Sequence, residues 1–116
     1  MARLEALIQP ITGGPERDLA MERLAERLGG EFFGLDARNA AITLTAGPGD
    51  LPMQVLLEWR PPEQLVVLLK SRERTGSGAP LSRAVLDQVL EALLQAAGGA
   101  RVLFRSDRDG PVRQVA

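Results

Sequence analysis

The segment of the sequence most suited to chemistry is the run Thr-Gly-Ser-Gly at residues 75–78, between a predicted strand and a predicted helix. Backbone N–H groups of such a loop can bind a phosphate at the start of the following helix. The run lacks the Gly-Lys-Ser or Gly-Lys-Thr ending of a nucleotide-binding loop, and Pro80 removes one backbone donor. We therefore interpret this segment as a plain connector.

Carboxylates are the second group of candidates, because they can bind cations or transfer protons. Asp107 and Asp109 precede a glycine, as in the opening of a calcium-binding loop, but the third ligand and the distant glutamate are missing. A hairpin turn is the better interpretation. Glu58, Glu63 and Glu73 could pair for acid–base catalysis, but each falls in a strand or turn pattern that we expect to be solvated.

Lys70 is the single lysine among 14 basic residues, and it lies in an apolar segment at residues 64–72. An amine in apolar surroundings can serve as a nucleophile. A lysine on an edge strand more commonly prevents edge-to-edge aggregation, and we adopt that interpretation.

The sequence contains no histidine, no cysteine and no tyrosine. Histidine is the commonest general acid–base and transition-metal ligand, and cysteine is the strongest ready nucleophile. Without both, most familiar active sites and nearly all zinc, iron and copper sites cannot be formed. We therefore expect no catalytic residue, no metal site and no cofactor, in a protein that is not an enzyme.

The bulk composition predicts one small globular domain over residues 1–116. Hydrophobic residues make up 45% of the chain but aromatic ones only 3%, so the core must be aliphatic. The formal net charge of −1 gives no long-range attraction to nucleic acid or to an anionic membrane. No apolar run approaches the roughly 18 residues that a membrane-spanning helix needs. We expect a cytoplasmic protein.

Apolar spacing predicts two amphipathic helices and a shorter N-terminal element. Residues 1–14 are expected to form a short helix or arm, because three residues with helical spacing precede Pro10: Leu4, Leu7 and Ile8. A helix follows over residues 15–28 and ends at two glycines. The strongest helical pattern runs over residues 81–97 and also ends at two glycines.

Four extended segments lie between these helices, at residues 31–36, 40–46, 53–60 and 64–72. Alternation in the first three predicts an antiparallel meander with one solvated face. The fourth segment has no polar face, so both of its sides must be covered. A terminal hairpin of residues 101–106 and 111–115 completes an α+β fold of order α-β-β-β-β-α-β-β.

The helix at residues 81–97 has an apolar surface wider than contact with one sheet requires. Together with the apolar fourth strand, it predicts a homodimer or a hetero-complex. A sheet that curls around the helix is the alternative that needs no partner. We expect the dimer interface to include Trp59, Leu86, Leu90, Leu93 and Leu94.

In its layout the chain resembles the class I type III secretion chaperones. The resemblance rests on an amphipathic helix at residues 19–28, strands over 32–69, a long apolar helix at 81–97 and further strands. It implies a cytoplasmic homodimer that keeps an effector or secretion component export-competent. It also implies that the partner segment wraps over the first helix and the sheet, partly by strand addition. The sequence differs in predicting four strands before the second helix, where the family usually has three.

The first functional hypothesis is therefore a non-catalytic protein-binding module, and by resemblance a secretion chaperone. Binding would use an exposed strand edge and the apolar residues Leu24, Leu28, Phe32 and Phe33. The alternative is a small regulatory or nucleic-acid-associated protein that contacts phosphates through the C-terminal arginines Arg101, Arg105 and Arg113. An enzyme that uses only carboxylates and hydroxyls is the third hypothesis.

Overall fold

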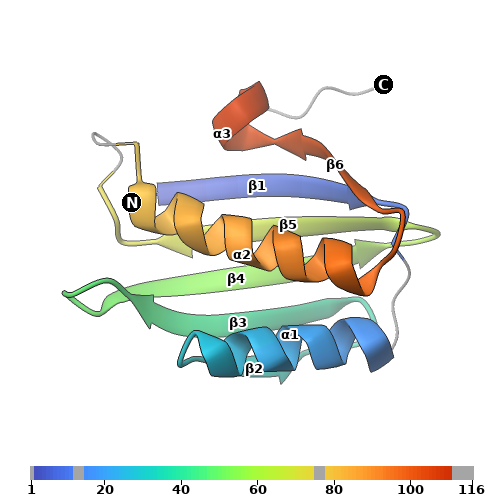
Figure 1. Ribbon diagram of the computed structural model, residues 1–116, viewed down its shortest axis with the longest axis horizontal. Coiled ribbons are helices and arrows are strands. Elements are labelled where there is room, and N and C mark those ends of the chain that lie inside the picture. Colours follow the sequence, from blue (N-terminus) through green and yellow to red (C-terminus); the bar gives the residue numbers. More distant parts are fainter. Residues whose placement is uncertain (1, 12–14, 75–77, 111–116) are drawn as a thin grey trace.

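The computed structural model describes residues 2–11, 15–74 and 78–110, which form an antiparallel sheet with two long helices on one side (Figure 1). The strand order is β2-β3-β4-β5-β1-β6. The strands are β1 (Ala2–Gln9), β2 (Glu31–Gly34), β3 (Asn39–Ala46), β4 (Leu51–Arg60), β5 (Gln64–Ser71) and β6 (Arg101–Arg105). The helices are α1 (Pro15–Arg27), α2 (Pro80–Ala96) and the short α3 (Ser106–Asp109). The predicted α+β class is confirmed.

The two long helices and the four strands between them lie where the sequence predicted them. Asp36 closes the β2–β3 turn, because its carboxylate accepts hydrogen bonds from the backbone N–H groups of Arg38 (2.8 Å) and Asn39 (2.9 Å). Gly30 lets the link between α1 and β2 approach β3. A Cβ atom at Gly30 would lie 2.3 Å from the carbonyl oxygen of Thr43.

Residues 2–9 form the strand β1, so the prediction of a short helix or arm in the N-terminal segment is wrong. β1 pairs antiparallel with β5 on one side and with β6 on the other. Leu4 and Ile8 fit both structures, since a spacing of four residues matches about one helical turn and also the even alternation of a strand. β5 therefore becomes an interior strand between β4 and β1.

The C-terminal region also differs from the predicted hairpin. β6 ends at Arg105, and the chain turns directly into α3. Asp107 and Asp109, expected in a hairpin turn, lie in this helix. The predicted last strand at residues 111–115 lies outside the described residues.

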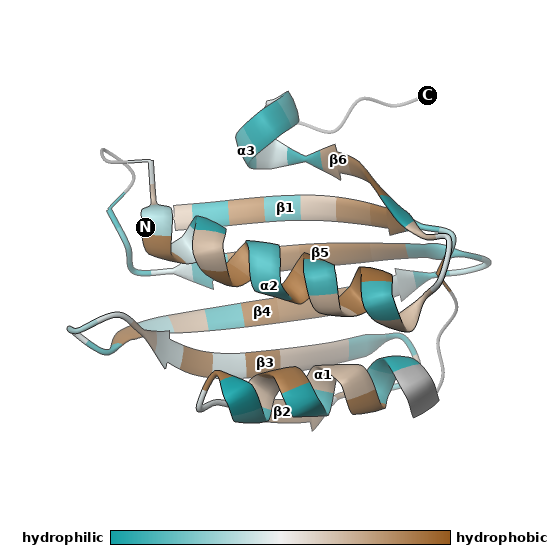
Figure 2. Cartoon of the chain, in the orientation of Figure 1, coloured by the Kyte–Doolittle hydropathy of each residue, from teal (hydrophilic) through white to brown (hydrophobic). Residues whose placement is uncertain are grey.

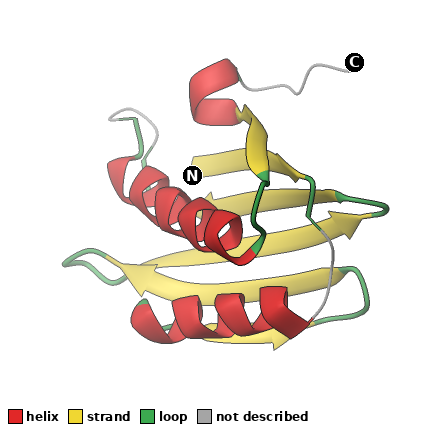
Figure 3. Cartoon of the chain, turned by 45° about the vertical axis from the view of Figure 1, so that its right-hand side comes forward, coloured by secondary structure: helices red, strands yellow, loops and turns green. Residues whose placement is uncertain are grey.

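The two long helices cover one side of the sheet (Figure 3), and the hydrophobic core is formed by residues of these helices and of the sheet. The helices contribute Met21, Leu24, Ala25, Val85, Leu86, Val89, Leu90 and Leu93. The central strands contribute alternate residues, including Ile42, Val55, Leu57, Leu65, Val67 and Leu69. This set is aliphatic, as the low aromatic content predicted.

The sheet has two different faces, which we call the inner face, beneath α1 and α2, and the outer face, opposite to it. Both long helices lie on the same side of the sheet in two views (Figures 1 and 3). No helix or strand of the described residues covers the outer face. The sequence predicted that both sides of β5 are covered. Within the described residues helices cover only its inner side, while on the outer side Val66 is buried by neighbouring side chains and Leu68 is half-buried.

Candidate functional site

The four predicted partner-binding residues lie in different environments. Leu24 is fully buried in the core, and Leu28 and Phe32 are partly buried against it. Phe33 is 42% exposed, and it lies on the outer face because neighbouring strand residues point to opposite faces. The structure therefore does not join the four residues into one surface.

A shallow groove between α1 and β2 does offer accessible apolar surface beside Phe32. Leu19, which was not among the predicted partner-binding residues, lines this groove and is 46% exposed. The groove has a volume of about 460 Å³. The charged residues that line the groove are three glutamates, Glu22, Glu26 and Glu31, and one arginine, Arg23.

The strand next to this groove is an edge of the sheet. β2 pairs with β3 alone, so its other side has no strand partner among the described residues. An edge strand presents unpaired backbone N–H and C=O groups that can pair with an added strand. We call this unpaired side of β2 together with the Leu19–Phe32 groove the α1–β2 site.

Most of the predicted dimer residues belong to the core of the chain itself. Leu86, Leu90 and Leu93 are buried, and Leu94 and Trp59 are partly buried against the core. Helix α2 contacts α1 as well as β1 and β5. Its broad apolar surface is thus explained by two kinds of neighbour within one chain, so these buried leucines offer no accessible dimer surface.

Accessible apolar surface is found instead across the outer face. Strand register places Phe33, Ala41, Leu56 and Leu68 in one row across four strands, and Glu5 of β1 continues this row. The next row contains Val66, Leu7 and Phe104. We call the seven apolar residues of these two rows the outer band. The central strands are coloured as apolar over much of their length in Figure 2.

The outer band combines side chains that are nearly buried by their neighbours with others that remain accessible. Ala41, Val66 and Phe104 are buried, whereas Leu7, Leu56 and Leu68 are half-buried. A hollow of about 530 Å³ lies over part of the band. Its apolar lining includes Leu35, Leu56, Val66 and Leu68, and its polar lining consists of Arg3, Glu5, Asp36, Asn39, Glu58 and Arg60. Leu35 is 61% exposed.

Polar rows border the outer band at both ends. At one end Gln54, Lys70 and Arg3 follow one another across β4, β5 and β1. At the other end Arg60 and Gln64 pair across β4 and β5, and Arg60 forms an ion pair of 2.7 Å with Glu58, which lies in the row of Val66. Asp36 lines the hollow at this second end. The outer face therefore has apolar rows between polar ones, and Glu5 of β1 lies beside Leu68 within the apolar part.

Among the carboxylates predicted to be solvated, Glu58 and Glu63 are exposed as expected, whereas Glu73 is only 9% exposed. The Glu73 carboxylate accepts hydrogen bonds from the backbone N–H groups of Leu81 (2.9 Å) and Ser82 (2.7 Å). It also accepts one from the Ser82 hydroxyl (2.7 Å), which lies 2.7 Å from the hydroxyl of Ser71. Glu73 thus caps the start of α2.

The hydrogen bonds of this cap affect both the pKa of Glu73 and the backbone N–H groups that could bind a phosphate at the start of α2. Burial opposes ionisation of this carboxyl, but the hydrogen bonds from Ser82 and Leu81 outweigh it and lower the pKa of Glu73. Two backbone donors at the start of α2 are therefore already bound within the chain. Residues 75–77 of the phosphate-binding candidate lie outside the described residues.

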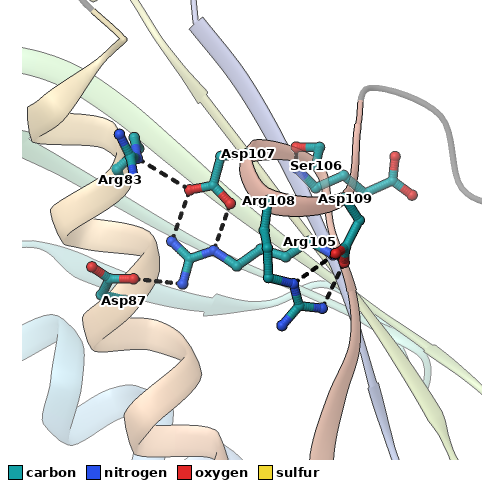
Figure 4. A network of polar contacts seen from close by, with 8 residues as sticks. Arg83, Asp87, Arg105, Ser106, Asp107, Arg108 and Asp109 are labelled. Atoms are coloured by element: carbon teal, nitrogen blue, oxygen red, sulfur yellow. Dashed lines mark hydrogen bonds and ion pairs between the residues drawn. The ribbon is translucent and has the colours of Figure 1, made fainter.

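A second polar network joins the end of β6 and α3 to α2 (Figure 4). The guanidinium of Arg105 donates to Asp107 at 2.6 and 2.9 Å and forms an ion pair with Asp87 on α2. Arg83 lies 3.3 Å from the same Asp107 carboxylate. Burial of Asp107 opposes its ionisation, but the hydrogen bonds and charge of Arg105 lower its pKa.

This network changes the interpretation of the C-terminal charges. Asp107 is held by arginines and does not form the predicted hairpin turn. Arg105, one of the arginines considered for phosphate contacts, is committed to two carboxylates. Arg101 is exposed, whereas Arg113 lies outside the described residues. Within the described part of the chain, no group of three or more metal-ligating side chains is found.

Lys70 does not lie on an edge strand, as the sequence had suggested. It is exposed on the outer face of β5, an interior strand, so the explanation as an edge-strand lysine is wrong. The prediction failed because residues 2–9 were expected to form a helix or arm. The strand β1, which pairs with the free edge of β5, was therefore missed.

Comparisons of the sequence with known protein families and with curated proteins gave no match. Over the described residues, none of the helices has both the length and the apolar character required to cross a membrane.

Proposed function

We propose that this chain is a non-catalytic protein-binding module that holds an extended segment of another protein at the α1–β2 site. The observation that carries this proposal is an edge strand beside an accessible apolar groove. β2 presents an unpaired side, and Leu19 and Phe32 line the adjoining hollow.

The two parts of the α1–β2 site supply different components of binding. Strand addition to β2 provides backbone hydrogen bonds that depend little on the sequence of the bound segment. Apolar side chains of that segment would pack on Leu19 and Phe32, and basic side chains would face the acidic lining of the groove. The expected ligand is an extended segment that alternates apolar and basic residues.

The polar groups of the chain support a role without catalysis. Glu73 caps α2, and Arg105 and Asp107 bind α3 to α2. Each of these buried or half-buried groups has a structural partner, which leaves it poorly placed to act on a substrate. This arrangement also gives no support to a nucleic-acid contact through Arg105.

A secretion chaperone is the more specific form of the proposal. In the class I type III secretion chaperones that the sequence resembles, the partner wraps over the first helix and the sheet, partly by strand addition. An amphipathic helix beside an edge strand supports the same use here. In this form the chain acts in the cytoplasm and keeps an effector or secretion component export-competent.

The proposal is tested by affinity capture of the tagged full chain from its native host, followed by mass spectrometry. Leu19→Asp places a charge in the groove, and Leu103→Asp makes the same change at a 40% exposed leucine on β6. We expect proteins retained by the wild type and by the Leu103→Asp control to be lost from Leu19→Asp. Capture of nothing by the wild type, or of the same proteins by both variants, would contradict the proposal.

A further inference from the structure

We infer that the outer face carries a second binding site, at Arg3, Lys70 and Arg72, for an acidic amphipathic helix of another protein. We call these three residues the basic corner. This second site shares no residue with the α1–β2 site, and neither site depends on the other.

The basic corner lies where β4, β5 and β1 run side by side. Lys70 stands opposite Arg3 of β1 on one side and opposite Gln54 of β4 on the other. Arg72 follows Lys70 by two residues, and its backbone N–H donates to the carbonyl oxygen of Pro52 at 3.4 Å, which continues the pairing of β4 with β5. Alternate residues of a strand share a face, so Arg72 lies on the outer face with Lys70. All three basic residues are exposed.

The positive charge of the basic corner is not balanced within the chain. Like charges directly opposite each other on neighbouring strands destabilise a sheet, and Arg3 and Lys70 have this arrangement. None of the ion pairs found among the described residues includes Arg3, Lys70 or Arg72. Glu5 lies diagonally from Lys70 and offsets one of the three positive charges. The corner therefore keeps a net positive charge and fits an anionic partner.

The surroundings of the basic corner do not cancel this charge. Asp50 and Arg74 are both exposed just beyond the paired ends of β4 and β5, and they add one charge of each sign. Glu58 and Arg60, towards the opposite end of the outer face, form an ion pair with each other. The excess of positive charge is thus confined to one corner of the face.

The row beside the basic corner favours a protein as the partner over a nucleic acid. Leu56 and Leu68 form part of this row and are half-buried. Apolar side chains of a protein would gain free energy by packing there, whereas the phosphates of a nucleic acid would not. The corner also has no aromatic side chain on which a base could stack. The surface therefore fits a segment that combines acidic and apolar side chains.

The pairing of the strands favours a helical segment. β4 and β5 are interior strands with a neighbour on each side, so their backbones cannot accept an added strand. A segment that lies over Leu56, Leu68 and Lys70 must then satisfy its own backbone hydrogen bonds, as a helix does. Helices already cover the inner face of the same sheet (Figure 1). The partner helix would place an apolar stripe over the two leucines and an acidic stripe over the basic corner.

Designed helical peptides added to the isotope-labelled full chain test the inference, with NMR shifts and the dissociation constant as readouts. One probe carries a leucine stripe flanked by glutamates, and the other has lysines in place of the glutamates. We expect the glutamate peptide to shift the amides of Leu68 and Lys70 and to bind about tenfold more tightly than the lysine peptide. Lys70→Glu should weaken binding of the glutamate peptide about tenfold. Combining it with Arg3→Glu should reverse the preference between the peptides, which a folding defect could not do.

Arg101→Glu is the matched control, because it makes the same change of charge at an exposed position on β6. We expect it to leave the dissociation constant of the glutamate peptide unchanged. Failure of that peptide to bind, shifts confined to other elements, or equal weakening by Arg101→Glu would overturn the inference.

Other occupants of the basic corner would give different results. Binding of single-stranded DNA that Lys70→Glu abolishes would assign the corner to a nucleic acid. Shifts of the Leu68 and Lys70 amides that depend on protein concentration without peptide would assign it to a second copy. Either result would overturn the inference. Leu19→Asp should bind the glutamate peptide as the wild type does, so failure of the α1–β2 site and failure of the basic corner are separate results.

Discussion

The inner and outer faces of the sheet are built from the same strands but differ in how far their apolar side chains are buried. In β5, Val67 and Leu69 point inward and are fully buried beneath the helices. Their neighbours Val66 and Leu68 point outward, where no helix or strand of the described residues covers them. Apolar residues on the inner face are therefore fully buried in the core, whereas on the outer face Val66 is buried by its neighbours and Leu68 stays half-buried.

The largest expected difference between the faces comes from adjacent leucines in one strand. Leu69→Ala removes a fully buried side chain and should lower the free energy of unfolding by about 2–5 kcal/mol. Leu68→Ala removes a half-buried one and should cost about 1 kcal/mol or less. Urea denaturation at low protein concentration measures both values. Equal losses would show that the two faces do not differ in this way.

Glu73 tests what holds α2 in place over the inner face. Glu73→Ala removes the acceptor for three hydrogen bonds, and the expected loss of unfolding free energy is about 1–3 kcal/mol. Glu73→Gln keeps an acceptor oxygen and should lose less. Hydrogen exchange of the Leu81 and Ser82 amides should speed up in Glu73→Ala, and unchanged exchange would contradict the capping role.

The same cap predicts a contribution to pH dependence. The folded state lowers the pKa of Glu73 below its ordinary value of 4.5, so the folded state favours the ionised carboxylate. The stability it contributes is therefore present above pH 4.5 and is lost as the pH falls through the folded-state pKa. Between pH 7 and pH 3 the wild type should lose more stability than Glu73→Gln. Parallel pH profiles would disprove the assignment, since other carboxylates titrate in both proteins.

Loss of the Arg105 network is expected to have the smallest effect on stability, because the network links only α3 and the end of β6 to α2. Asp107→Asn weakens the contacts of α3 with Arg105 and Arg83, so α3 amides should exchange faster while α2 remains protected. Arg108→Ala is a suitable control, since its ion pair with Asp109 lies within α3. Faster exchange throughout α2 in Asp107→Asn would show that the network supports the whole inner layer.

The sequence was sufficient to predict the elements that have strong local signals. Both long helices show wide apolar stripes and end at glycine pairs, and the strands from β2 to β5 are separated by clear turn residues. β1 was missed because the spacing of Leu4 and Ile8 suits a helix as well as a strand. That one error hid the interior position of β5 and led to the wrong explanation for Lys70.

The predicted sites were less accurate because they depend on contacts between distant segments. The apolar width of α2 suggested a dimer, but contact with α1 inside the same chain accounts for it. Glu73 lies eight residues before Leu81, too far for the local pattern that marks a helix cap. Of the predicted partner-binding residues, Phe33 is exposed on the outer face, whereas Leu24 belongs to the core.

The most direct test of the central claim is affinity capture by the full chain with and without a charge in the α1–β2 groove. We predict that the wild type and the Leu103→Asp control retain the same proteins, and that Leu19→Asp loses them while its circular dichroism spectrum is unchanged. Capture of nothing by the wild type, or of the same proteins by Leu19→Asp, would contradict the assignment of the α1–β2 site to partner binding.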